Sequence, residues 1–205
     1  RSILQETKQL TTPEFSYKGI TQLPTISSLS TIYDSDINSV STNITASSES
    51  TVAGFIAGIW AGSHKATAQL TGAKASNYEI INNETFDYNI SKAPLEVILN
   101  GNTIIYGDAP VDNGYTIKGF ENGETVAVLG NSISYTHSYS RYGNIGDYDI
   151  NASGFTSNNY EITYTKATLT VEARKVEITF TDLDSYVYKK GEYSHQQQSS
   201  KQPPG

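Results

Sequence analysis

The sequence predicts an all-β protein built from tandem small β-sandwich modules, with at most one short helical turn. Three observations predict it: a polar composition, an internal repeat that returns after 82 residues, and apolar residues that alternate with polar ones. Only 37% of the 205 residues are hydrophobic, while Ser, Thr, Asn, Tyr and Gly are abundant. Two-faced sheets bury only alternate residues, so this composition suits them better than it suits a helical bundle.

Charge and residue usage exclude several classes of partner and site. The net charge is −7, and the 14 cations are scattered among 21 carboxylates, whereas nucleic acids bind clustered Lys and Arg. We therefore expect no nucleic acid partner. The absence of Cys excludes a disulfide scaffold and thiolate chemistry. The longest apolar run, residues 52–62, is too short to span a bilayer, so no membrane insertion is expected.

The internal repeat is clearest around two tyrosines. Tyr78 and Tyr160 both lie in the sequence Asn-Tyr-Glu-Ile, and the segment at 92–97 resembles the one at 166–171. The start of a third repeat appears at 175–178. A unit of this length suits a small β-sandwich, whose typical size is roughly 100 residues. Each repeat is therefore expected to fold as a bead with its own core.

The repeat predicts the domain organisation. The expected parts are a first repeat over 1–91, a second over 92–173, the start of a third over 174–192 and a polar tail over 193–205. Alternatively, the residues after 173 add an edge strand to the second repeat. The tail of Gln, Ser, Lys and Pro is too polar to form a core, which predicts disorder. Because the chain starts at Arg1 and contains no Met, we interpret it as part of a longer protein whose export signal or anchor lies outside it.

Period-two alternation marks the strands. His64, Ala66, Ala68 and Leu70 share one face of a predicted strand, and polar residues occupy the other. The same pattern predicts strands at 148–153, 160–164 and 167–171. Asn-Gly turn signals separate such segments at 100–102, 112–114 and 121–123. A short helical turn is expected at 123–129 or at 52–60.

The second repeat carries a recognisable series of motifs. In order they are APLEV, the segment from IIYGDAP to TVAVL, GNIGDYDINASG and SNNYEITYTKATLTV. With them, residues 93–171 resemble a mostly bacterial Ig-like (MBG) domain. The first repeat, over 15–90, is similar to related surface repeats, but His64 replaces their usual Tyr and a Ser-rich loop over 27–52 is longer. The resemblance implies tandem Ig-like sandwiches in large exported bacterial proteins, commonly adhesin-like or wall-attached, with no catalysis of their own.

Paired Gly and aromatic positions are predicted to be structural. A Gly before a strand allows a turn that a Cβ would oppose. The hydroxyl of Tyr148 is then expected to bond back to that turn, as in a tyrosine corner, and His64 is expected to do the same with a ring nitrogen. The predicted structural residues are Gly62, His64, Tyr78, Gly146, Tyr148 and Tyr160.

The sequence is rich in Tyr, with 15 residues, and this is its most suggestive feature for ligand binding. Tyr135, Tyr139 and Tyr142 lie within one short Ser- and Tyr-rich stretch, and aromatics beside small polar residues can stack sugars or form a protein-contact surface. The simpler interpretation is that Tyr suits half-exposed strands. These three residues and the 27–52 loop are the candidate ligand site.

No catalytic or cofactor-binding motif is present. His64, His137 and His195 lie too far apart in sequence for a metal motif, so neither a metal nor another cofactor is expected. Nucleophile elbows, P-loops and dinucleotide fingerprints are missing, so we expect no enzyme. Lys92 and Lys166 occupy similar final strands and are expected to face solvent, which argues against an isopeptide crosslink.

Two functions remain open. The first is a non-catalytic spacer or display module of an exported bacterial cell-surface protein, extracellular and located at the cell surface or cell wall. The alternative is an adhesin or carbohydrate-binding module that uses the Tyr-rich loops. The expected partners are neighbouring repeats of the same chain and a host protein, matrix protein or glycan.

Overall fold

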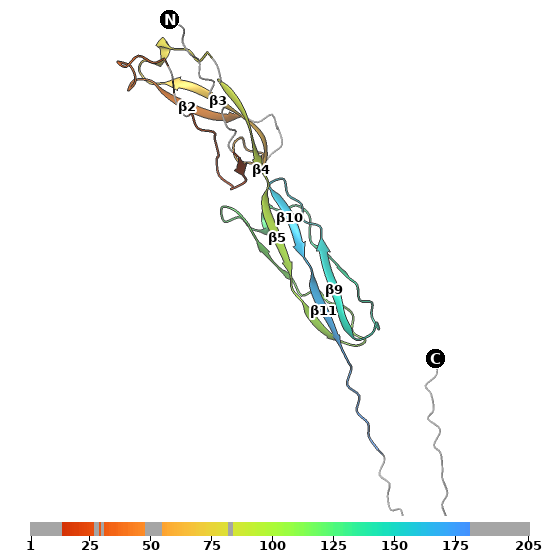
Figure 1. Cartoon of the computed structure of the whole chain (residues 1–205). Helices are drawn as coiled ribbons and strands as arrows, with labels where there is room; N and C mark the ends of the chain where they lie inside the picture. The colour runs from red at the N-terminus through yellow and green to blue at the C-terminus, as the bar shows by residue number, and fades with distance from the viewer. Residues whose placement is uncertain (1–13, 27–28, 30, 48–54, 82–83, 181–205) are drawn as a thin grey trace, which may run out of the picture. The chain divides into compact units, whose positions relative to one another are not determined.

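The computed structural model describes residues 14–26, 29, 31–47, 55–81 and 84–180 (Figure 1). The described residues up to Arg174 form one compact unit, and those from Lys175 on belong to a second unit. The described residues form β-strands and two short 3-10 turns, which confirms the all-β prediction. The described part of the chain contains no helix with the length and hydropathy of a membrane span.

The first module, residues 14–91, contains one four-stranded sheet. Its strands are β1 (Phe15–Ser16), β2 (Ser41–Ser47), β3 (Gly62–Thr71) and β4 (Thr85–Ser91), in the order β1-β4-β3-β2. β1 pairs with β4 in parallel, and the other two pairs are antiparallel. A 3-10 turn, η1 (Ala75–Asn77), follows β3.

The second module, residues 92–174, contains two sheets. The smaller consists of β5 (Ala93–Leu99), β7 (Tyr115–Lys118) and β10 (Tyr160–Thr165), in the order β10-β5-β7. β10 and β5 run in parallel through six paired positions, and they lie side by side in Figure 1. β7 pairs with the other edge of β5 and runs antiparallel to it.

The larger sheet of the second module has four strands. They are β6 (Asn102–Ile105), β8 (Ser134–His137), β9 (Gly146–Ser153) and β11 (Ala167–Glu172), in the order β6-β11-β9-β8. The 3-10 turn η2 (Val126–Val128) precedes β8. Buried side chains from both sheets pack into one core, which contains Val97, Leu99, Ile104, Tyr139, Ile150, Leu169 and Val171.

The four-stranded sheets of the two modules have the same topology. In each, a short strand pairs in parallel with the last strand, which pairs antiparallel with a strand that begins at a glycine. Gly62 lies opposite Ile90 in the first sheet, and Gly146 lies opposite Val171 in the second. The sequence repeat therefore corresponds to a repeat of strand order and register.

The repeated Asn-Tyr-Glu-Ile sequence does not give the same structure twice. Tyr160 opens β10, whereas Tyr78 follows η1 in a segment without a strand. β10 is held by backbone pairing with β5, and no described strand lies beside residues 78–81. The Tyr78 hydroxyl instead donates to Asp36 at 2.9 Å.

The 3-10 turn η2 lies inside 123–129 and confirms that alternative for the short helical turn; of the other candidate, residues 57–59 form a turn and 52–54 lie outside the described residues. Two further expectations need correction. The 27–52 segment is not one loop, because β2 lies within it and pairs with β3 along seven residues. Residues 173–180 belong to no strand, and the rest of the predicted third repeat and tail, 181–205, lies outside the described residues.

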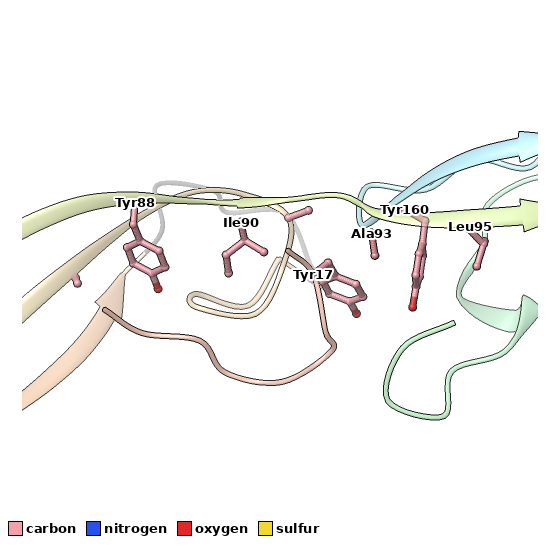
Figure 2. Packing of buried hydrophobic residues seen from close by; sticks show 8 residues of the cluster. Tyr17, Tyr88, Ile90, Ala93, Leu95 and Tyr160 are labelled. Atoms are coloured by element: carbon pink, nitrogen blue, oxygen red, sulfur yellow. The ribbon is translucent and has the colours of Figure 1, made fainter. Parts of the chain in front are cut away.

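A single buried cluster crosses from one module into the other. Only Lys92 separates the end of β4 from the start of β5. Figure 2 shows side chains from both modules on one side of this continuous stretch. The buried members are Tyr17, Ala61, Ala66, Tyr88, Ile90, Ala93, Leu95 and Tyr160. The expectation of a separate core for each repeat is therefore wrong at this boundary.

Candidate functional site

The junction between the modules is organised around one carboxylate. Glu124 accepts a hydrogen bond from the Tyr17 hydroxyl at 2.7 Å through one oxygen, and from the Tyr160 hydroxyl through the other. Tyr17 follows β1 of the first module, while Tyr160 opens β10 of the second. The Tyr160 oxygen also accepts from the Glu121 backbone N–H at 2.9 Å. We call Tyr17, Glu124 and Tyr160 the junction cluster.

Ring packing reinforces the junction cluster. The Tyr17 and Tyr160 rings meet edge to face with centroids 5.3 Å apart, and Phe120 contacts Tyr160 in the same way at 5.6 Å. Tyr17 is 3% exposed and Tyr160 is 2% exposed. Each such aromatic pair contributes about 0.5–1.5 kcal/mol beyond the area that it buries.

Two further hydrogen bonds join the modules through backbone groups. The Ala61 N–H donates to the Asn159 side-chain oxygen at 3.0 Å, and the Asn122 amide donates to the Gly19 carbonyl at 3.1 Å. Asn159 is itself fixed, because its backbone carbonyl accepts from the Ala93 N–H at 3.0 Å. The loops of the two modules are therefore held together at several points.

Burial changes the acidity of both tyrosines. Removal from water raises the pKa of Tyr17 to about 12, and the hydrogen bond and negative charge of Glu124 act in the same direction. The same causes, with burial again first, raise the pKa of Tyr160. Both effects disfavour the tyrosinate form, which would repel the carboxylate.

These shifts predict that the protein loses stability at high pH. Folding raises the pKa of such a phenol, so the phenol stabilises the folded state. This stabilisation is complete below the unfolded pKa of about 10. It is lost as the pH rises through the folded pKa, which is about 12 for Tyr17. The free energy of unfolding should therefore fall between pH 10 and pH 12, by up to about 1.4 kcal/mol per pH unit for each tyrosine. Urea midpoints at several pH values, with tyrosinate absorbance recorded in parallel, measure this loss. An equally steep loss in the Tyr17→Phe, Tyr160→Phe double variant would contradict the assignment.

The Gly and aromatic pairs occupy matching positions. Gly62 and Gly146 have φ angles of +148° and +138°, a region that L side chains rarely adopt. The Tyr148 hydroxyl donates to the Asn144 carbonyl at 2.9 Å, and His64 Nε2 lies 2.7 Å from the Trp60 carbonyl, in each case four residues back. His64 Nδ1 also accepts from the Gly58 N–H at 3.0 Å, so the proton lies on Nε2 and the ring is neutral.

The three candidate ligand tyrosines do not share one exposed surface. Tyr135 lies in β8 and packs half-buried against the core of the second module, and Tyr139 is buried in that core. Tyr142 is exposed, with the Arg141 guanidinium 5.1 Å from its ring centroid. A sugar could stack on Tyr142 but could not reach the ring of Tyr139.

Lys92 and Lys166 have hydrogen-bond partners, whereas the buried His137 Nε2 has none. His137 Nε2 is buried and lies 3.2 Å from an Asp112 oxygen without hydrogen-bond geometry, and His195 lies outside the described residues. Within the described ranges, no three His, Asp or Glu side chains come together as a metal site. Lys92 donates to the Ser157 carbonyl at 2.9 Å, and Lys166 pairs with Asp149 at 3.0 Å.

Sequence reasoning missed most of this junction. Glu124 lies in the segment between β7 and η2, and no local pattern distinguishes it from the other carboxylates. Asn159 does lie in the repeated Asn-Tyr sequence, and Tyr17-Lys18-Gly19 is loosely similar to Tyr106-Gly107-Asp108, which is a signal of structural importance. That signal does not indicate that the two residues face one another across the modules.

Comparison with known families gives a match within the second module. Residues 95–170 match the family model described as MBG domain (YGX type). The match lies within the second module and confirms the resemblance drawn from its motifs. No curated protein and no solved structure matches the chain.

Proposed function

Because residues 95–170 match the MBG domain family of the YGX type, we propose that this chain is a non-catalytic spacer or display segment of an exported bacterial cell-surface protein. It acts outside the cell, at the surface or in the cell wall. MBG repeats are a non-enzymatic domain type that suits proteins of this class. The core shared across the junction is the observation that carries the spacer assignment.

A shared core is a physical basis for stiffness. Modules joined by a flexible linker move relative to one another by default, unless their interface is large and apolar. Here one residue separates β4 from β5, and the junction cluster adds hydrogen bonds from both modules to one carboxylate. A segment that presents another domain away from a cell surface benefits from such a junction, because the domain then keeps its position.

Nuclear magnetic relaxation of the full chain tests the stiffness. Amides of the first and second modules should share one rotational diffusion tensor. In the Tyr17→Ala, Glu124→Ala double variant the two modules should reorient with separate correlation times, while Tyr142→Ala serves as a matched surface control. Separate correlation times in the unsubstituted chain would refute the stiff-spacer assignment.

Cell-surface exposure needs its own test. Protease treatment of intact source cells should release peptides of this chain, and an antibody against the second module should bind unpermeabilised cells. Detection only after lysis would contradict the proposed location.

The adhesin alternative predicts a different result. A glycan array and a pull-down against host matrix proteins should give no specific binding if the chain is a spacer. Specific binding that is lost in Tyr142→Ala would replace the spacer function by ligand recognition. The burial of Tyr139 leaves the Tyr-rich stretch with less exposed aromatic surface than that alternative expects.

A further inference from the structure

The second module has two tyrosine rings in contact at its surface. The rings of Tyr106 and Tyr142 meet edge to face with centroids 6.4 Å apart, within the range in which aromatic pairs touch. Tyr106 is 39% exposed and Tyr142 is 63% exposed, so both residues are open to solvent. Tyr106 follows β6, whereas Tyr142 lies between β8 and β9. We call these two residues the surface pair.

The other two tyrosine pairs in the described part of the chain are shielded. Tyr17 and Tyr160 are almost completely buried at the junction. Tyr139, whose ring centroid lies 5.0 Å from that of Tyr148, is 3% exposed. The surface pair therefore combines ring contact with access from solvent to both rings, and the shielded pairs do not.

Two arginines hold the segments that carry the surface pair. The Arg141 Nε–H donates to the Gly107 carbonyl at 2.7 Å, and its guanidinium lies 5.1 Å from the centroid of the neighbouring Tyr142 ring. Arg174 donates to the Tyr106 carbonyl at 2.9 Å. Arg141 thus ties one tyrosine's segment to the other's, and Arg174 fixes the backbone of the segment that follows β6.

The backbone at Tyr142 has a conformation that large side chains rarely adopt. Its φ is +70°, in the left-handed region that favours glycine. The Gly143 N–H donates to the Ser140 carbonyl at 2.8 Å and closes a tight turn around Arg141 and Tyr142. Such strained residues persist only where the surrounding structure holds them, and they cluster at functional sites. The turn and the Arg141 hydrogen bond together keep the Tyr142 ring beside its partner.

The composition directs oxidation toward tyrosine. Cys and Met, whose sulfur atoms are common targets of oxidants, are both absent from the sequence, while Tyr occurs 15 times. A one-electron oxidant therefore meets phenols that no thiol or thioether protects by reacting first. Two exposed phenols in contact have the geometry in which a pair of tyrosyl radicals can couple.

We propose that the surface pair is a site of oxidative crosslinking, at which Tyr106 and Tyr142 are joined as dityrosine. The oxidant is hydrogen peroxide, used by a haem peroxidase. Each phenol loses one electron and one proton, and the two phenoxyl radicals couple through ring carbons ortho to the oxygens. The hydrogen on each of these carbons then moves to oxygen, so that one C–C bond replaces two C–H bonds. The peroxide takes up the two electrons and two protons and is reduced to two molecules of water.

The link braces the second module. It joins the segment after β6 to the turn before β9, and these are distant in sequence. A covalent link of this kind restricts the unfolded chain, as a disulfide does in a protein that contains Cys. The inference goes beyond the proposed spacer function, because it concerns a modification within the second module alone.

Peroxidase treatment of the full chain tests this proposal. Dilute protein is treated with a haem peroxidase and hydrogen peroxide, monomers are separated from crosslinked oligomers, and dityrosine is measured by its fluorescence. Mass spectrometry of tryptic peptides locates the link, because the joined peptides lack two hydrogen atoms. Most of the intramolecular dityrosine should join Tyr106 to Tyr142, and the linked monomer should have a higher urea midpoint than the untreated chain.

Single substitutions assign the link to the surface pair. Tyr106→Phe and Tyr142→Phe should each lower the dityrosine of the monomer several-fold, because phenylalanine keeps the ring but forms no phenoxyl radical. Tyr33→Phe is the matched control and should leave the yield unchanged, since Tyr33 is 76% exposed but lies outside the surface pair. Arg141→Gln should lower the initial rate several-fold by releasing the turn.

Three results would overturn the proposal. They are dityrosine confined to oligomers, intramolecular links that spread over the exposed tyrosines as they do in the urea-unfolded chain, and an unchanged yield in Tyr142→Phe. An unchanged urea midpoint of the linked monomer would overturn its bracing role. Each of these failures is distinguishable from a failure of the proposed function, since the relaxation and cell-surface experiments involve no oxidation.

Discussion

Replacing Tyr160 by alanine should lower the free energy of unfolding by about 3–5 kcal/mol, the usual cost of deleting a fully buried aromatic side chain. The substitution removes the ring that Tyr17 and Phe120 pack against, and it also removes a hydroxyl bonded to Glu124 and to the Glu121 N–H. Urea denaturation followed by circular dichroism measures the change.

Two companion variants separate packing from hydrogen bonding. Tyr160→Phe keeps the ring and should cost about 1–3 kcal/mol, because it leaves the Glu121 N–H and one Glu124 oxygen without this partner. Tyr142→Ala, at an exposed tyrosine, should change the stability by less than about 0.5 kcal/mol. If Tyr160→Ala costs no more than Tyr142→Ala, the shared core does not hold the modules together.

Replacing Gly62 by alanine should cost about 2–6 kcal/mol, since two penalties combine. A non-Gly residue at φ +148° is strained by about 1–3 kcal/mol. The new methyl group would also overlap the Trp60 ring, and such overpacking typically costs a further 1–3 kcal/mol, roughly. The fluorescence of Trp60, the only Trp of the chain, follows unfolding of the first module directly.

Gly146→Ala is the matched control for this prediction. Gly146 has a similar φ of +138°, but a Cβ there would meet no atom within 4 Å. It should therefore cost only the backbone strain, about 1–3 kcal/mol. Equal losses in the two variants would show that the Trp60 ring moves aside without cost.

The contacts at the junction explain why the two modules do not behave as independent domains on a flexible linker. In a chain of separate sandwiches, each module would bury its own apolar residues and the connection would be free to bend. Here Tyr17 leaves the first module's sheet to pack on Tyr160, and Glu124 bonds to both hydroxyls. Separating the modules would expose the facing sides of two aromatic rings and break the three hydrogen bonds Tyr17–Glu124, Ala61–Asn159 and Asn122–Gly19.

The sequence by itself determined the class of fold, the repeat and the family of the second module. Alternation of apolar and polar residues placed β3, β9, β10 and β11 close to their observed bounds, because side chains along a strand point to opposite faces regardless of what lies nearby. The glycines that open β3 and β9 were also foreseen, since a positive φ is a local requirement of the backbone.

Only the tertiary structure decided which residues meet and which are covered. Tyr78 and Tyr160 share the same local sequence, yet only Tyr160 gains a strand partner and a buried position. Tyr139 and Tyr142 lie three residues apart, yet one is buried and the other exposed. Tyr17 and Glu124 are 107 residues apart and meet only because the two modules pack together. Burial depends on the element that covers a side chain, and that element is distant in sequence.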